Sequence, residues 1–247
     1  MIDQIDTNQI KKIIGEDGFY CLKDYINNEE LTILREFVDS KIKENNNQYF
    51  FLTSENSQKT LLNNDNFFQK IETLLKKITT EYNYLNRENE NLYKVLRVVT
   101  GKKSKKVSLD FHFDAHLLTL LIPIYIPNRI NSDNGNLVII KNLRNITKNI
   151  FKNVLQKLFY QSKFYKKFFI NKNLSKTETL YLKPGNAYIF NGFRTLHANH
   201  NVDPRDIRAT ILVHYYDIFK DSFLVKKNRE MRIKKELKNI KSNQTEN

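Results

Sequence analysis

Two histidines and one aspartate have the types and the spacing of a metal-binding set. His112 and Asp114 are separated by one residue, and residues i and i+2 of a β-strand point to the same face, about 6.6 Å apart along the backbone. His197 follows in the stretch Gly-Phe-Arg-Thr-Leu-His and is the natural third ligand. Two imidazoles and one carboxylate on one face of an octahedron leave three positions free, which suits non-haem Fe(II). We therefore expect His112, Asp114 and His197 to bind a metal. The competing interpretation is a buried, hydrogen-bonded pair for His112 and Asp114, and a polar hairpin residue for His197.

An arginine and a threonine further along the chain suit a carboxylate ligand. Arg208 lies eleven residues beyond His197, and Thr210 shares its strand face. A guanidinium beside a hydroxyl provides a bidentate cradle for a carboxylate, which lysine would match poorly. Arg97, among β-branched neighbours on another predicted strand, is a further candidate for an inward-facing carboxylate contact. The alternative for Arg208 is a surface ion pair.

The other histidines and the single cysteine are weaker candidates. His200 is a rival distal ligand, but it lies near a predicted turn, where a solvated role is favoured. His116 would lie about 13 Å from His112 in an extended strand, too far for both to reach one ion. It is expected near the substrate or in a structural role, and His214 is expected to be a core histidine. Cys21 is expected to be a buried small residue.

The elements that must position these residues change character along the chain. Apolar residues at helical spacing predict N-terminal helices from Asn8, from Asn28 with Asn27 as its N-cap, and from about Asp65 to Tyr84. Strands are expected at Phe19–Leu22, Tyr93–Val99, 107–127, 136–140, 179–182, 187–190, 195–198 and 207–216. This order predicts an α+β, mainly β fold: a double-stranded β-helix (jelly roll, cupin-like barrel) with flanking N-terminal helices.

A basic segment interrupts the predicted strands. Residues 141–176 carry ten Lys and Arg and no Asp or Glu, with apolar residues at helical spacing. This helical insertion either packs its apolar face over the barrel or forms a lid or docking surface for an acidic substrate. We expect one domain at 1–217 containing this insertion, and a basic, partly disordered helical tail at 218–247.

The composition excludes several classes of protein. Lys and Arg number 41 against 27 Asp and Glu, a formal charge of +14, which reflects either AT-rich codon usage or an anionic partner. A single cysteine excludes an intramolecular disulfide and any multi-cysteine zinc or iron–sulfur site. The longest apolar run, 117–127, is shorter than the roughly 20 residues of a membrane span. The polar start, MIDQIDTNQ, predicts no secretory signal and a cytoplasmic location.

The pattern His112-x-Asp114, His197 and Arg208-x-Thr210 resembles the 2-oxoglutarate/Fe(II)-dependent dioxygenases, and more narrowly the phytanoyl-CoA dioxygenase-like family. The Asp-Gly-Phe-Tyr that leads into the strand at Phe19–Leu22 and the segment Asn134-Gly-Asn-Leu are also similar to that family, so the resemblance covers roughly residues 8–217. It implies Fe(II) on the three ligands, 2-oxoglutarate with its far carboxylate on Arg208 and Thr210, and O2 as the oxidant. The chain lacks the Gly-Ser-His that often follows in the family, so phytanoyl-CoA itself is not implied. The presence of Asp114 favours hydroxylation over halogenation.

The expected function is therefore a dioxygenase that hydroxylates an unactivated carbon of a small-molecule or lipid/acyl-type substrate, with an anionic substrate as one form. We expect a monomer or weak homodimer with no nucleic-acid partner. The alternative is a non-catalytic, basic barrel that binds nucleic acid or an anionic membrane surface. The intact ligand and arginine set favours the enzyme.

Overall fold

The computed structural model describes residues 6–54, 62, 64–82, 90–102, 104–127, 133–170, 176–223 and the single residues 227, 230, 231 and 234. Its helices are α1 (Thr7–Asp17), α2 (Asn28–Glu44), α3 (Asp65–Thr80), α4 (Ile150–Tyr160) and α5 (Lys163–Tyr165). Its strands are β1 (Phe19–Leu22), β2 (Phe50–Thr53), β3 (Tyr93–Val99), β4 (His116–Tyr125), β5 (Leu137–Ile140), β6 (Glu178–Leu180), β7 (Ala187–Phe190), β8 (Leu196–Asn199) and β9 (Arg208–Asp217). A 3₁₀ turn (Ser104–Val107) and a π turn (Lys166–Ile170) complete these elements.

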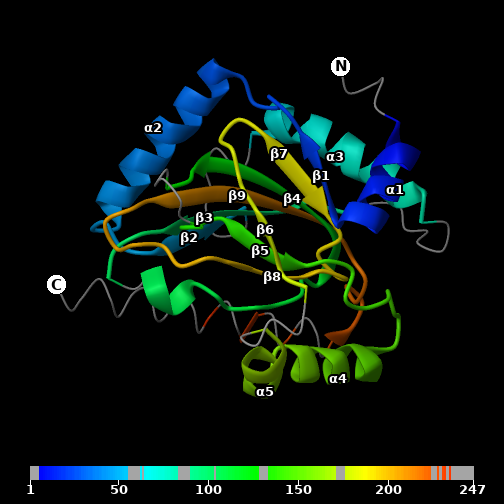
Figure 1. Cartoon of the computed structure of the whole chain (residues 1–247). Coiled ribbons are helices and arrows are strands. Elements are labelled where there is room, and N and C mark those ends of the chain that lie inside the picture. The colour runs from blue at the N-terminus through cyan, green and yellow to red at the C-terminus, as the bar shows by residue number, and fades with distance from the viewer. Residues whose placement is uncertain are drawn as a thin grey trace.

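The strands form two antiparallel sheets that face one another (Figure 1). The larger sheet has the order β1-β7-β4-β9-β3-β2, and the smaller has the order β6-β5-β8. A single bridge between His112 and His197 adds one more pairing beside β8. The α+β jelly-roll architecture expected from the sequence is confirmed.

The larger sheet is covered by the N-terminal helices, and this double burial explains the sequence of β4. Leu118, Leu120 and Ile122 belong to the core shared with α1, α2 and α3, whereas Leu121 belongs to the core between the two sheets. A strand buried on both faces reads as a continuous apolar run rather than an alternating one. The larger sheet thus separates the core under the helices from the core between the two sheets.

The N-terminal helices begin where the sequence predicts. Asn27 accepts a hydrogen bond from the Glu30 backbone, and the Glu30 side chain accepts one from the Asn27 backbone, which is a complete capping box. The Asp6 side chain caps α1 by accepting from the backbone of its first turn. Gly18 then ends α1 in the left-handed conformation, at φ 86°, and directs the chain into β1.

The strand predicted over 107–127 is wrong in its first half. Ser104–Val107 form a 3₁₀ turn, Leu109 has a left-handed backbone at φ 53°, and regular pairing begins only at His116. The Ser108 hydroxyl donates to the Ser104 carbonyl, a local bond that competes with strand pairing. Strand β2, whose four residues pair with β3 at the edge of the larger sheet, was also not predicted.

The insertion at 141–176 forms α4, α5 and the π turn within its described residues. Its apolar residues divide: Ile146 and Ile150 pack against the main core, whereas Phe151, Leu155 and Leu158 are exposed, and the buried residue of α4 is Asn153. Most of the tail expected at 218–247 lies outside the described residues. No helix in the described ranges is both long enough and apolar enough to cross a membrane.

Candidate metal and carboxylate site

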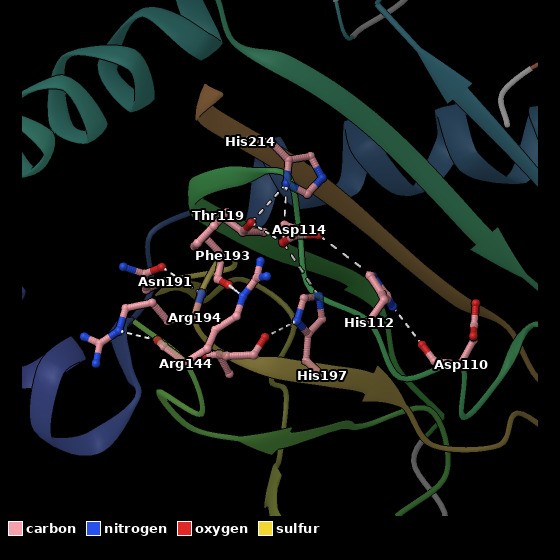
Figure 2. A network of polar contacts seen from close by, with 11 residues as sticks. Asp110, His112, Asp114, Thr119, Arg144, Asn191, Phe193, Arg194, His197 and His214 are labelled. Atoms are coloured by element: carbon pink, nitrogen blue, oxygen red, sulfur yellow. Dashed lines mark hydrogen bonds and ion pairs between the residues drawn. The ribbon is translucent and has the colours of Figure 1, made fainter. Parts of the chain in front are cut away.

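His112, Asp114 and His197 converge on one point between the sheets, as Figure 2 shows. One potential ligand atom from each residue lies within 4.8 Å of the others. His112 Nε2 is 3.9 Å from Asp114 Oδ1, and His197 Nε2 is 3.7 Å from Asp114 Oδ2. His112 and His197 come from paired segments, and the Asp114 amide donates to the Gly192 carbonyl at 2.9 Å. The irregular backbone before β4 thus brings together the side chains expected to share a strand face.

The backbone fixes both imidazoles in the tautomer that a metal needs. His112 Nδ1 donates to the Asp110 carbonyl at 2.7 Å, and His197 Nδ1 donates to the Thr195 carbonyl at 3.0 Å. Each Nε2 therefore keeps its lone pair and points at the centre of the triad. Burial, together with the neighbouring His197, lowers the pKa of His112 to about 4, so the ring is neutral near pH 7.

Asp114 is held as a carboxylate. Burial by itself would raise its pKa, but the three surrounding histidines and a hydrogen bond from Thr119 lower the pKa well below its usual range. Thr119 Oγ1 donates to Asp114 Oδ2 at 2.5 Å. The imidazoles of His112 and His197 and an ionised carboxylate form the donor set of a facial metal site.

Gly192 leaves the space that this carboxylate occupies. A Cβ at position 192 would lie 2.5 Å from Thr119 Oγ1 and closer still to Asp114 Oδ2. Such contacts are too short for any side chain, so the backbone at Gly192 can approach the ligand only because the residue is glycine.

His214 extends the polar cluster on the far side of Asp114. Its Nδ1 lies 3.0 Å from Thr119 Oγ1 and 3.7 Å from Asp114 Oδ2. Since the threonine hydroxyl gives its one proton to Asp114, His214 Nδ1 must carry the proton that it shares with that oxygen. The His214 ring stacks at 5.2 Å on His116, which in turn stacks on Tyr93. His214 therefore contacts Thr119 and Asp114 of the site, and His116 packs against the His214 ring.

The predicted carboxylate-binding residues also lie together, on neighbouring strands. Arg208 Nη1 donates to Thr210 Oγ1 at 3.2 Å, and Arg97 lies directly opposite Thr210 in the β3–β9 ladder. Arg208 is buried, so the surface ion pair considered as its alternative is excluded. Burial, and secondarily the nearby Arg97, lower its pKa. The buried Nε of Arg97 has no hydrogen-bond partner among the described residues. A buried guanidinium beside a half-buried one favours an anionic ligand.

The segment Asn134-Gly-Asn-Leu holds Arg208 in place. Arg208 Nε donates to the Gly135 carbonyl at 2.6 Å. Gly135 has φ 72°, and a Cβ there would touch Pro127 and the Arg208 side chain. The flanking Asn134 accepts from the Asp203 backbone. The conformation that only glycine adopts easily thus presents a carbonyl to the guanidinium.

One cavity joins the triad to the arginines. It encloses about 470 Å³ of empty space, part of it open to solvent. His112, Asp114 and His197 line it together with Arg97 and Arg208. Its apolar wall is formed by Leu121, Leu137, Phe190 and Leu212.

A third arginine, itself buried, approaches the triad from the insertion. The Arg144 guanidinium lies between the rings of Phe113 and Phe193, 4.1 and 3.9 Å from their centroids. Its Nε donates to the Phe193 carbonyl and its Nη1 to Asn153 Oδ1. Burial lowers its pKa, and the Asp114 carboxylate opposes that shift, so Arg144 adds positive potential beside the ligand.

The remaining candidates lie outside the cluster. His200 Nε2 contacts Thr179 Oγ1 at 3.0 Å and Asp133 at 3.9 Å, so it is not part of the triad. Cys21 is half-buried and has a free thiol.

Sequence reasoning missed Thr119, Gly192 and Arg144 and undervalued His214. Thr119 carries a visible signal, since it is an isolated hydroxyl within the most apolar run of the chain. Gly192 is one of only six glycines and lies five residues before a predicted ligand. Arg144 has no such signal, because it is one of ten basic residues in the insertion.

Comparisons with known proteins rest on structure alone. No protein-family model and no curated protein sequence matches this chain. The non-haem α-ketoglutarate-dependent carbocyclase SnoK from nogalamycin biosynthesis matches with a TM-score of 0.57 at 12% identity, over 87% of this chain and 86% of that one. AviO1 from Streptomyces viridochromogenes matches with a TM-score of 0.56 at 11% identity, over 87% and 96%. A Pseudomonas putida prolyl-4-hydroxylase matches with a TM-score of 0.53 at 9% identity, over 85% and 98%. This chain therefore shares its fold with solved non-haem, α-ketoglutarate-dependent enzymes.

Proposed function

We propose that this protein is a 2-oxoglutarate- and Fe(II)-dependent dioxygenase that hydroxylates an unactivated carbon. One observation carries the proposal: a single cavity is lined both by the His112, Asp114 and His197 triad and by Arg208 and Arg97. A metal-chelating dicarboxylate would suit these two sets of side chains, with its keto acid toward the triad and its far carboxylate on the arginines. 2-Oxoglutarate is such a molecule.

The residues present suit Fe(II). Mixed imidazole and carboxylate ligation with open positions is the arrangement of non-haem iron oxygenases, whereas structural zinc sites are usually closed by four protein ligands. When bound, Fe(II) and 2-oxoglutarate would supply the reduction of O2, with release of succinate and CO2 and oxidation of a carbon–hydrogen bond. The protein's part is to bind, orient and exclude water.

Each group of side chains has a separate role in this proposal. Thr119 and His214 keep Asp114 ionised and fix its orientation. Arg208, with Thr210 and Arg97, binds and orients the far carboxylate of the cosubstrate. The apolar wall of the cavity limits the access of water to the bound reactants.

The substrate belongs to the small-molecule or lipid/acyl class, and an anionic group on it would be attracted by Arg144 and the basic insertion. The fold does not choose among substrates: its neighbours include a carbocyclase, a prolyl hydroxylase and the epimerase SnoN solved with Fe3+, α-ketoglutarate and nogalamycin RO. We further propose that the protein is related to the phytanoyl-CoA dioxygenase-like family. It would be cytoplasmic, and a monomer or a weak homodimer.

Anaerobic titration tests the assignment without the substrate. Adding Fe(II) and then 2-oxoglutarate should produce the weak visible charge-transfer band of the chelate, and admitting O2 should yield succinate by uncoupled turnover. Asp114→Ala and His197→Ala should lose both signals, while His200→Ala, outside the triad, should keep them. Retention of full succinate formation by either triad variant would refute the assignment. A folded wild-type protein that shows no band and no succinate would favour the non-catalytic alternative.

A further inference from the structure

Helix α4 presents its apolar side to solvent. Phe151, Leu155 and Leu158 are 82%, 67% and 66% exposed, at positions i, i+4 and i+7 of one face. Asn153, which lies on the opposite side, is the buried residue of the helix. Amphipathic helices of soluble domains normally bury the apolar side, so this orientation calls for a partner.

The exposed apolar surface continues past the end of α4. Phe159 is 48% exposed, and Phe164 and Phe168, which pack on each other at 4.8 Å, are 56% and 38% exposed. We call Phe151, Leu155, Leu158, Phe159, Phe164 and Phe168 the apolar patch. Val154, also on α4, is 45% exposed, whereas Ile33 and Tyr181 lie on or near other elements. Most of the exposed large apolar side chains among the described residues are therefore gathered on this one segment rather than spread over the surface.

Contacts on the inner side fix α4 in this orientation. Asn153 Oδ1 accepts from the buried Arg144 at 2.8 Å, and the Tyr160 ring packs edge-on against Phe113 at 5.9 Å. The buried Tyr165 packs against Tyr160, and Lys166 Nζ donates to the Leu109 carbonyl. Turning the apolar side inward would break the bond to a buried guanidinium, which is costly. The helix, which lies at the outside of the fold (Figure 1), is thus held with its apolar patch outward.

Exposed lysines surround this patch, and no acid interrupts them. Lys152 flanks the apolar face of α4, and the exposed Lys163 and Lys167 flank the two phenylalanines that follow. The whole insertion contains no Asp or Glu. A helix with aromatic and aliphatic residues on one side and lysines along its border has the composition of helices that lie in the interface of an anionic bilayer.

We propose that the apolar patch docks on the surface of an anionic lipid bilayer, with its phenylalanines and leucines in the headgroup region and the lysines on lipid phosphates. A second copy of the chain fits less well, because two such patches would bring like charges together. Single-stranded nucleic acid also fits less well, because Leu155 and Leu158 offer no stacking surface for bases. The proposal does not depend on oxygenase chemistry, because none of these residues is a triad or cosubstrate residue.

The absence of tryptophan from the chain makes a direct test possible. Phe151→Trp gives a protein with one tryptophan, placed in the apolar patch, and Ile33→Trp places one on the exposed surface of α2 as a matched control. Vesicles containing phosphatidylglycerol should shift the emission of the Phe151→Trp protein to the blue, and brominated lipid should quench it. The control should respond to neither. Equal responses from both proteins, or no response from the Phe151→Trp protein, would overturn the proposal.

Vesicle flotation separates the apolar and electrostatic contributions. Phe151→Gln with Leu155→Gln should lower binding to phosphatidylglycerol vesicles at least about ten-fold. Lys152→Gln with Lys163→Gln should lower it about five-fold per charge removed. Lys70→Gln with Lys76→Gln, exposed on α3, should leave binding unchanged, and thermal unfolding should show that every variant is folded. Wild-type binding should weaken with salt and be small on phosphatidylcholine.

Three outcomes would count against a bilayer partner. Equal binding to neutral and anionic vesicles would show that the lysines do not contribute to binding. A blue shift of the Phe151→Trp protein that grows with protein concentration in the absence of lipid would indicate a second copy. Binding to a single-stranded oligonucleotide through Lys152 and Lys163, with no vesicle binding, would indicate nucleic acid.

Discussion

The hydroxyl of Thr119 donates a 2.5 Å hydrogen bond to Oδ2 of Asp114, and this bond comes from within the long, buried strand β4. The carboxylate is thereby tied to the rigid larger sheet, although Asp114 itself lies on irregular chain. The orientation of the proposed metal ligand therefore depends on β4 as well as on its own segment.

Thr119→Val should weaken metal binding while keeping the volume of the side chain. The loss of one donor to a metal ligand typically lowers metal affinity by about 10- to 100-fold. Anaerobic calorimetry with Fe(II), or with Mn(II) as a stable substitute, measures this change. Thr119→Ser keeps the hydroxyl and should bind nearly as well as the wild type. Equal affinity of the valine variant and the wild type would show that the bond does not orient Asp114.

Gly192→Ala should displace Asp114, because the new methyl group would overlap its carboxylate and the Thr119 hydroxyl. We expect a loss of metal affinity and a free energy of unfolding lower by about 1–3 kcal/mol, the usual cost of overpacking. Gly15→Ala is the matched control, because a Cβ there meets nothing within 4 Å and the residue lies within α1. Within a helix that change should be neutral or stabilising by up to about 1 kcal/mol. If both variants unfolded and bound metal alike, the close approach at Gly192 would be unimportant.

Arg208→Ala should raise the 2-oxoglutarate requirement about 30-fold or more, because a buried charge contact that loses one partner costs about 2–5 kcal/mol. Arg208→Lys should recover only part of this loss, since one ammonium cannot reproduce the planar fork. Arg205→Ala, on an exposed side chain paired with Asp203, is the control and should change little. Titration of the charge-transfer band with 2-oxoglutarate gives the affinity directly. An unaltered affinity in the alanine variant would place the far carboxylate elsewhere.

The stability of the metal-free protein should fall as the pH falls from about 6.5 to about 4. His112 has its pKa lowered to about 4 in the folded state, so the unfolded chain binds the proton more readily throughout this interval. His112→Gln should flatten the pH dependence measured by urea unfolding in the presence of a chelator. Part of the slope should remain, because burial also lowers the pKa of His200. Asp114 acts in a lower window, since its contribution is lost only as the pH falls below the usual carboxyl value of 3.8. A slope unchanged by His112→Gln would contradict the pKa assigned to this histidine.

The features that follow from local spacing and residue type in the sequence were predicted. The features that depend on contacts between distant segments were not. The periodic helices and the apolar β4 follow from local spacing, and the triad follows from residue type. The route of the chain into the site was not predictable, because the left-handed Leu109 and the 3₁₀ turn before it carry no periodic signal. The roles of Thr119, Gly192 and Arg144 are set by partners outside their own elements, as in the bond from Arg144 to the Phe193 carbonyl.

The insertion also shows where pattern alone is ambiguous. Its helical face was visible in the sequence, but periodicity does not say whether a face turns toward the protein or toward solvent. The orientation is decided by inward contacts, chiefly those of Asn153 with Arg144 and of Tyr160 with Phe113. The same composition thus allowed both alternatives, and these contacts distinguish them.

The insertion begins and ends on neighbouring strands, because β5 pairs with β6 and Ile139 lies opposite Glu178 in that ladder. It is topologically a long hairpin loop, and its length can change without altering the register of either sheet. Natural variation or a designed chimera can therefore replace the whole loop with another while the proposed metal ligands stay in place. A transplanted loop must supply a side chain that fills the space between Phe113 and Phe193, where the guanidinium of Arg144 lies.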